Sequence, residues 1–484
     1  MIVESAFILS CLVGGSVLIR ILGIKGWGVP ALGFLVGLCL YVTLGSLLLA
    51  LSIETSPLLQ IALVGILPLA VWYLFLSRGF DVKMNTFYCL VALILSVLLV
   101  MFFRQANFIN WSVDTLAHLQ LGSLIATGNY TATAPERMVQ LPLALPIINT
   151  PANIIEQYYL RSVVPLIGLS TILTFSWILY TGIRNEMEKK FAVIYTITGA
   201  ILLLSVNRFI FSSFYINNHI LFAGLILIVV GCGWLLTKKI SGLNDVKLIT
   251  LQLIILPTLV LTRPEAPLIV AFSILPTLFI HRLPWKIRRV PLLALGLSTI
   301  ALQVFLIIQH LDQGASLPFS VIGMLAFGAV CVATAYLVKA EWLKRRFKSI
   351  ISFTEYGIWI SLVFLALINH RSIFKSLNSV TQNLFLGEGS WGLSIIMFIG
   401  LMLWLNTTRR AKGSVALRIP ITTFVPLMFI IAFLRGGGYR VGNGDSLNRA
   451  IVHILPVLVL HVVVLTAIGV DRPWFKKLKK KLFV

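Results

Sequence analysis

Long apolar runs alternate along the chain with short polar loops. An α-helix rises about 1.5 Å per residue, so about 20 apolar residues cross the hydrocarbon core of a bilayer. Counted at that length, the pattern predicts an all-α, polytopic transmembrane bundle of about 15 spans. The expected spans are 3–22, 27–53, 57–77, 86–103, 162–183, 191–207, 218–236, 247–262, 264–281, 290–310, 317–338, 351–369, 390–407, 419–434 and 450–470.

The composition is that of a membrane protein. Of 484 residues, 58% are hydrophobic and only 11% are charged, and the mean hydropathy is +0.98. A soluble domain carries about a quarter charged residues. No small-residue cleavage site precedes the first apolar run, so we expect that run to remain as a helix. The five cysteines all lie in apolar runs and show no spacing typical of disulfides or metal sites: Cys11, Cys39, Cys89, Cys232 and Cys331.

The basic residues predict an orientation in the membrane. A net charge of +23 would suggest nucleic acid in a soluble protein, but 29 of the 39 basic residues fall in alternate short loops and the C-terminal tail. Loops rich in Lys and Arg stay in the cytoplasm. We therefore expect the N-terminus outside, the C-terminus inside, an odd number of spans and no nucleic-acid partner. The most fitting location is a bacterial inner membrane, with the basic tail anchored to anionic lipid.

The ten basic residues of the outer loops carry a second signal, because nine are arginines whereas 17 of the 29 inner ones are lysines. Orientation needs only charge, but a guanidinium suits a bidentate phosphate or carboxylate partner. The outer set therefore predicts ligand binding, with scattered contacts to lipid headgroups as the alternative. It consists of Arg104, Arg137, Arg161, Arg208, Arg263, Arg371, Lys375, Arg435, Arg440 and Arg449.

The expected spans divide the chain into four parts. Residues 1–103 form N-terminal transmembrane helices, and residues 104–160 form a long outer loop. The main transmembrane bundle covers residues 161–470, and a basic cytoplasmic tail covers residues 471–484. Leu-Pro pairs, Asn and aromatic residues late in the outer loop predict interfacial helices that lie along the membrane.

The outer loop also holds the first candidate site. Ser112 is a plausible N-cap for a short helix that ends near Gly128. Asp114 and His118 stand four residues apart, so they share one face of that helix. Together they could accept a proton or hold a divalent cation. Alternatively, Asp114 only stabilises the N-terminus of the helix.

A second cluster consists of Arg263 and Glu265 in a very short turn around Pro264. Ionisable residues at this depth are costly unless they face a wet cavity or pair with each other, and both alternatives stay open. Weaker candidates that could line the same cavity are Arg208, Asn218, His219, His370 and Arg371. Glu355 is either a proton site or one half of a local pair.

The third cluster covers residues 435–449, where five glycines within ten residues permit close approach of the backbone to a ligand. Arg435, Arg440 and Arg449 could hold a monophosphate or diphosphate. Asp445, Arg449 and His453 follow at intervals of four, which predicts one helical face at the outer boundary. A flexible loop with incidental charges is the alternative reading. No Walker pattern supports a nucleotide site.

The placement of these clusters resembles that of the GT-C-type membrane glycosyltransferases, which use polyprenyl-phosphate sugar donors. The resemblance covers the layout of about residues 90–470 and rests on three short motifs. They are Asp114 with His118 and the Gly128 turn, residues 262–266 (Thr-Arg-Pro-Glu-Ala), and Asn448–Arg449 followed by Pro456. Family members usually carry a paired acidic motif after their first helix, whereas Asp114 stands alone after the expected fourth.

The resemblance implies an inverting transfer of a sugar on the non-cytoplasmic face, to a lipid-linked or glycan acceptor in the cell envelope. Asp114 would be the catalytic base or a ligand of a divalent cation. Arg449, with Arg440 or Arg263, would hold the donor phosphate and stabilise it as the leaving group. The acceptor or cation site would be shaped by His118 and Glu265, and further substrate contacts would come from Arg208, Arg435 and His453.

Two other functions fit the same residues. A polysaccharide polymerase or O-antigen-ligase-like enzyme would use the outer arginines to hold a diphosphate-linked donor and would depend less on Asp114. A transporter or flippase of lipid-linked sugars would bind substrate without chemistry. Transporters often show inverted repeats with binding sites at the midplane. No obvious repeat joins the two halves of this sequence.

Overall fold

The computed structural model of the chain describes residues 2–53, 56–76, 94, 97–98, 100–102, 113–130, 142–155, 157, 159–240, 242–338, 340–434, 438–442 and 444–476. About 81% of the structure is helical. The two-residue strands β1 (Arg409–Arg410) and β2 (Val470–Asp471) pair antiparallel. The structure agrees with the predicted all-α class.

The helices include both long spans and short connecting pieces. In chain order they are α1 (Ile2–Ile21), α2 (Gly28–Ala50), α3 (Pro57–Leu76), α5 (Val113–Ala126), α7 (Ala144–Asn149), η2 (Thr150–Ile155), α8 (Val163–Ile183), α9 (Lys189–Leu204), α10 (Asn207–Ser213), α11 (His219–Lys238), α12 (Asp245–Thr262), α13 (Ala266–Leu278), α14 (Trp285–Arg288), α15 (Val290–Asp312), α16 (Phe319–Leu337), α17 (Ala340–Ile368), α18 (His370–Phe385), α19 (Leu393–Thr408), α20 (Val415–Leu434), α21 (Ser446–Ala450), η3 (Ile451–His453) and α22 (Leu455–Ile468).

Within the described residues, nine helices are long and apolar enough to cross a membrane, or eleven if each of two bent pairs counts as one span. The chain is thus a multi-pass membrane protein. One bend, of 77°, separates α9 from α10, and the other, of 47°, separates η3 from α22. Pro456 in the first turn of α22 cannot donate a backbone hydrogen bond, which favours the second bend. The expected span 86–103 falls largely outside the described residues.

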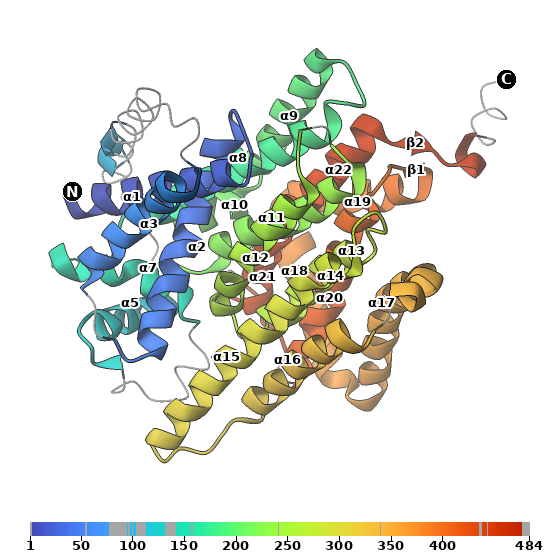
Figure 1. Cartoon of the computed structure of the whole chain (residues 1–484). Helices are drawn as coiled ribbons and strands as arrows, with labels where there is room; N and C mark the ends of the chain where they lie inside the picture. Colours follow the sequence, from blue (N-terminus) through green and yellow to red (C-terminus); the bar gives the residue numbers. More distant parts are fainter. Residues whose placement is uncertain are drawn as a thin grey trace.

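The core of the bundle is α11, whose membrane-spanning window is 94% buried. Helices α8, α12, α13, α20 and α22 pack around it (Figure 1). In contrast, only 22% of the window in α16 and 6% of the window in α17 are buried. These two helices lie at the edge of the bundle in Figure 1, where their apolar side chains are available to lipid.

Helices α1 and α2 cross at very short distance through glycines. A Cβ atom on Gly15 would lie 1.8 Å from the backbone oxygen of Gly33, and one on Gly37 would lie 1.9 Å from that of Cys11. Close crossings of this kind are typical of membrane helices, because small residues let the backbones approach. The N-terminal pair is further tied to the main bundle by Glu4, whose Oε1 accepts the Ser162 N–H at 2.7 Å.

Candidate functional site

The centre of the candidate site is a contact between residues that are 335 positions apart in the sequence. Arg449 Nη1 in α21 donates to Asp114 Oδ2 in α5 at 2.7 Å. The same Nη1 donates to Tyr215 Oη at 3.0 Å. Helix α5 is held in place there by Thr115, whose Oγ1 donates to the backbone oxygen of Ile216 at 3.0 Å. A carboxylate, a guanidinium and a phenol therefore meet at one point.

A second chain of polar contacts starts from Arg263, the C-cap residue of α12. Its Nε donates to Glu265 Oε1 at 2.6 Å, and its Nη1 lies 3.2 Å from His219 Nδ1. His219 Nδ1 also lies 2.8 Å from His453 Nε2. Because a guanidinium only donates, His219 Nδ1 is the acceptor nitrogen of its ring, and His453 Nε2 carries the proton that it donates. His219 therefore accepts hydrogen bonds at Nδ1 from both neighbours, and its ring is neutral in this arrangement.

His118 and Arg208 lie in the electrostatic field of the same cluster. His118 is 3% exposed, and burial lowers its pKa to about 4. The Asp114 carboxylate opposes that shift, whereas the guanidinium groups of Arg263 and Arg449 add to it. His118 is thus neutral at physiological pH. Arg208 in α10 is also buried, interacts electrostatically with Arg449, and places its guanidinium 5.3 Å from the ring centroid of Phe211.

These contacts define what we call the Arg449 cluster. Its members are Asp114, His118, Arg208, Tyr215, His219, Arg263, Glu265, Arg449 and His453. Three guanidinium groups face two carboxylates, so the cluster carries excess positive charge. Cationic, partly dehydrated sites of this kind attract anions.

Several buried polar atoms at this cluster have unused hydrogen-bonding capacity. Among the described residues, His118 Nδ1, Arg449 Nε and His453 Nδ1 are buried without a hydrogen-bond partner. Asn218, which precedes His219 and is 1% exposed, also has no hydrogen-bond partner for its side-chain Nδ2 and Oδ1. Buried polar atoms nearly always find partners in proteins or in bound water and ligands. The cluster can therefore accept several hydrogen bonds from, and donate several to, a polar ligand.

The remaining predicted residues lie elsewhere or play other roles. Arg440 has an exposed side chain, and its backbone N–H donates to Asp445 Oδ1 at 2.8 Å. Asp445 Oδ2 also accepts the Asn448 N–H at 3.0 Å, so Asp445 caps α21. Asp445 therefore serves as a helix cap, whereas Arg449 and His453, which were predicted to share its helical face, both belong to the cluster. The chain changes from α-helix to a 3₁₀ turn between Arg449 and His453. The predicted Arg435 lies outside the described residues.

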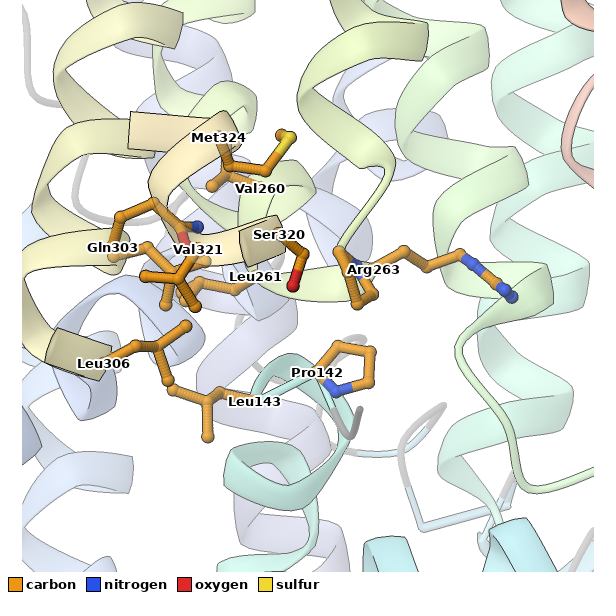
Figure 2. A pocket seen from close by; sticks show the side chains of 12 residues that line it. Pro142, Leu143, Val260, Leu261, Arg263, Gln303, Leu306, Ser320, Val321 and Met324 are labelled. Carbon is orange, nitrogen blue, oxygen red and sulfur yellow. The ribbon is translucent and has the colours of Figure 1, made fainter. Parts of the chain in front are cut away.

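Next to the cluster, an apolar pocket of about 40 Å³ opens between α12, α15 and α16. Its walls include Leu261, Leu302 and Val321, and Arg263 lies at its edge (Figure 2). Figure 2 shows that the guanidinium of Arg263 extends away from these apolar side chains. Arg263 therefore lies between a narrow apolar pocket on one side and the other members of the Arg449 cluster on the other.

The described residues do not fit a divalent cation. No three His, Cys, Asp or Glu side chains among them are close enough to hold one. Asp114, the predicted ligand, already pairs with Arg449, and the guanidinium groups around His118 repel a cation. The arrangement favours an anionic ligand instead.

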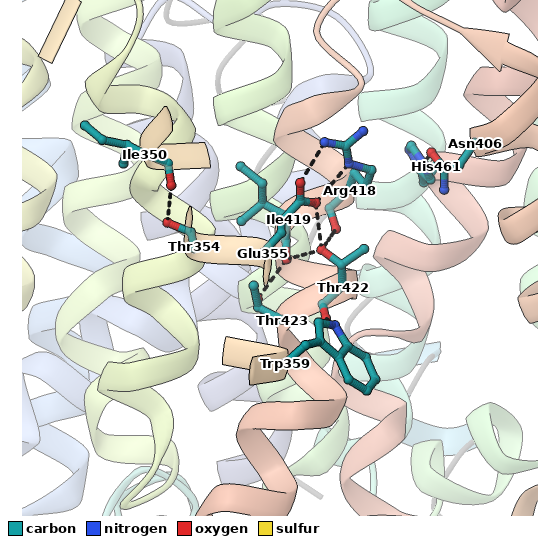
Figure 3. Close-up of polar contacts among 10 residues, drawn as sticks. All are labelled: Ile350, Thr354, Glu355, Trp359, Asn406, Arg418, Ile419, Thr422, Thr423 and His461. Carbon is teal, nitrogen blue, oxygen red and sulfur yellow. Dashed lines mark hydrogen bonds and ion pairs between the residues drawn. The ribbon is translucent and has the colours of Figure 1, made fainter. Parts of the chain in front are cut away.

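A separate ion pair explains Glu355. Arg418 in α20 donates to Glu355 in α17 through Nε at 2.9 Å and Nη2 at 2.8 Å, and Thr422 Oγ1 donates to the same carboxylate at 2.9 Å (Figure 3). The carboxylate is fully engaged, which favours the local-pair alternative over a proton site. Its position suggests that it anchors the lipid-exposed α17 to the bundle.

Tyr215 is the cluster residue that was not predicted from the sequence. Polar residues interrupt the apolar pattern at the start of α11, at Tyr215, Asn217, Asn218 and His219, and that interruption was the available signal. Comparisons with protein-family models, curated proteins and solved structures find no match for this chain. Its function is therefore inferred from the geometry of the cluster.

Proposed function

We propose that the chain is a GT-C-type membrane glycosyltransferase that transfers a sugar from a polyprenyl-phosphate donor to an acceptor hydroxyl, with inversion. The observation that carries the proposal is the 2.7 Å contact between Asp114 and Arg449 within a cluster of three arginines. Such a transfer needs a base for the acceptor and cations for the departing phosphate. The Arg449 cluster offers both groups at one point.

In the proposed reaction, the donor phosphate replaces the Asp114 carboxylate at Arg449. Arg263 and Arg208 add positive charge around the phosphate. The released Asp114 takes the proton of the acceptor hydroxyl, whose oxygen attacks the anomeric carbon from the face opposite the phosphate. The bond between the anomeric carbon and the phosphate oxygen breaks, and polyprenyl phosphate leaves with both electrons. The anomeric configuration is inverted.

The surroundings of the cluster suit both ends of such a donor. Neutral imidazoles and the Asn218 amide donate to and accept from sugar hydroxyls without adding charge. The apolar pocket that begins at Arg263 offers hydrocarbon contact beside the phosphate-binding guanidinium. A lipid-linked sugar phosphate combines sugar hydroxyls, a phosphate and a hydrocarbon chain. A soluble nucleotide sugar has no hydrocarbon part.

The proposal includes a topology of about 15 spans with the N-terminus outside and the cluster on the non-cytoplasmic face. The nine long helices, the two bent pairs, the shorter α3, α13 and α19, and the expected span 86–103 together supply that number. Three ion pairs support the proposed assignment of loops to the two sides of the membrane. Lys238 pairs with Glu186, Arg282 with Asp245, and Arg409 with Asp471. All six residues belong to the loops or tail expected in the cytoplasm.

One observation favours a second candidate, the polymerase or ligase-like enzyme with a diphosphate-linked donor. The cluster holds three arginines and three histidines but only two carboxylates, and Glu265 is already paired with Arg263. An enzyme that relies on Arg and His rather than on an acidic base would show this balance. The two candidates differ in how strongly they need Asp114.

The test is sugar transfer by the full-length protein, reconstituted in vesicles with radiolabelled polyprenyl-phosphate sugars and with a diphosphate-linked donor. Asp114→Asn and Arg449→Ala should each lower transfer from the monophosphate donor by roughly 10²–10³-fold. Asp245→Asn is the matched control, since it removes an ion-paired carboxylate at the other end of α12 from Arg263.

Each other outcome separates the candidates. Full transfer by Asp114→Asn, with loss in Arg449→Ala, would favour the ligase-like enzyme. No transfer by the wild type from any of these donors would refute both enzymes. Movement of intact lipid-linked sugar across the vesicle membrane would then indicate a flippase.

A further inference from the structure

Helix α18 (His370–Phe385) presents three chemically different sectors around its axis. Successive residues of an α-helix are turned by about 100°, which sorts the side chains as follows. The buried sector contains Ile373, Ser376, Ser379, Asn383 and Leu384. An exposed, mainly apolar sector contains Phe374, Leu377 and Phe385, which are 61%, 48% and 43% exposed, together with the polar His370 and Thr381. An exposed polar sector contains Arg371, Lys375 and Asn378.

The preceding helix fixes the depth of α18 relative to the membrane. Only 6% of the spanning window Ser349–Ile368 in α17 is buried, so lipid surrounds that window. Helix α18 follows after Asn369 alone, whose side chain caps it by accepting the Ser372 N–H at 3.2 Å. It therefore starts where α17 leaves the hydrocarbon.

The size and polarity of α18 fit the membrane boundary. It has 16 residues, and so a length of about 24 Å, short of a hydrocarbon core of about 30 Å. Its basic sector would be costly within that core, and its apolar sector would be costly in water. A helix lying along the boundary satisfies both sectors.

The buried sector of α18 binds the backbone of the turn 438–442. Asn383 does so with both ends of its amide: Nδ2 donates to the Arg440 oxygen at 2.9 Å, and Oδ1 accepts the Gly442 N–H at 2.7 Å. Ser379 Oγ donates to the Tyr439 oxygen at 2.8 Å. The turn thus has side-chain partners in place of the regular backbone ladder of a helix or sheet.

The same network continues to the residue beside Arg449. Asn448 Nδ2 donates to the backbone oxygens of Gly389 and Gly442, each at 3.3 Å. Trp391 Nε1 donates to Asn448 Oδ1. Helix α18, the turn and the start of α21 are therefore one hydrogen-bonded unit, and Arg449 projects from its end.

We propose that α18 is an interfacial helix that binds anionic lipid at the surface of the bilayer, and that Asn383 is a positioning residue for the turn leading to Arg449. Phe374, Leu377 and Phe385 enter the acyl boundary, and Arg371 and Lys375 face the lipid phosphates. The lipid surface thereby sets the depth of the Arg449 cluster. The inference holds whether or not the chain transfers sugars.

The orientation of α18 is tested with a nitroxide on the full-length protein, in vesicles of phosphatidylethanolamine and phosphatidylglycerol. The five native cysteines are replaced by alanine, and the label is placed on Leu377→Cys or on the adjacent Asn378→Cys. We expect oxygen to relax the label at 377 severalfold more strongly than a water-soluble nickel chelate does, with the reverse at 378. Stronger relaxation by the chelate at both positions, or shielding of 377 from both agents, would overturn the lipid assignment.

The positioning role is tested by amide hydrogen exchange, which requires no activity. Asn383→Ala should speed exchange of the Gly442 amide by roughly tenfold, since it removes that amide's acceptor. Thr381→Ala, an exposed position of the same helix, is the control and should match the wild type. Ser379→Ala is a milder second variant that loosens the same turn. Unchanged exchange in the turn of both Asn383→Ala and Ser379→Ala would refute the positioning role, and neither readout depends on the glycosyltransferase proposal.

Discussion

Replacing Asp114 by Asn should separate ligand binding from turnover. The substitution keeps the size of the side chain but removes the negative charge 2.7 Å from Arg449 Nη1. In the proposed reaction the donor phosphate must displace that carboxylate. We therefore expect Asp114→Asn to bind polyprenyl phosphate more tightly than the wild type, although it transfers far less sugar.

The exposure of the two partners sets the size of the effect. The Asp114 side chain is 48% exposed and that of Arg449 is 16% exposed, so water screens much of their attraction. An ion pair of this kind contributes about 1 kcal/mol, which corresponds to roughly fivefold tighter binding when the competing charge is removed. Loss of the base should lower turnover much more, by roughly 10²–10³-fold.

The assay is direct binding of polyprenyl phosphate to the purified full-length protein in nanodiscs, followed by single-turnover transfer with the same preparation. Asp245→Asn provides the matched control, because Asp245 pairs with Arg282 at the opposite end of α12 from Arg263. Weaker binding by Asp114→Asn would refute the displacement mechanism. Such a result would mean that the carboxylate assists the phosphate site rather than competing for it.

Three further predictions concern stability and are measured by unfolding in detergent. Glu355→Gln should lower the free energy of unfolding by about 1–3 kcal/mol, because Arg418 loses its bidentate partner; an unchanged melting temperature would contradict the anchoring role. The free energy of unfolding should be constant above about pH 6.5 and fall by about 3 kcal/mol as the pH drops through 4. Over this range the unfolded chain binds a proton at residue 118, whereas the buried His118 of the folded chain stays neutral. His118→Gln should flatten this dependence. Gly37→Ala should cost about 1–3 kcal/mol, since its Cβ would lie 1.9 Å from a backbone oxygen of α1, whereas Gly400→Ala, with nothing within 4 Å, should be neutral.

Much of the helical layout could be predicted because a membrane span must be apolar along its whole length. The expected spans 218–236 and 290–310 coincide with α11 and α15 within a few residues. Helix α18 was not predicted, because its apolar positions follow a helical stripe rather than a continuous run. The helix expected over 191–207 ends earlier than predicted, because the chain bends by 77° between α9 and α10.

The sequence identified charged residues of the site better than it identified their partners. Arg449 and Asp114 stood out because ionisable groups near a membrane are costly without a role. Their pairing with each other spans 335 positions and depends on the tertiary fold. Asp445 was grouped with Arg449 by spacing, but local geometry makes it a helix cap. Tyr215 was missed because tyrosine at a membrane boundary is usual in aromatic belts.

The contact between Asp114 and Arg449 also bears on how the proposed product would leave. After transfer, Asp114 holds the acceptor's proton and is neutral, so it does not compete with polyprenyl phosphate for Arg449. Release then waits until that proton is lost and the carboxylate returns to the guanidinium. Asn at position 114 stays neutral throughout. The tighter binding expected for Asp114→Asn should therefore include slower dissociation of polyprenyl phosphate.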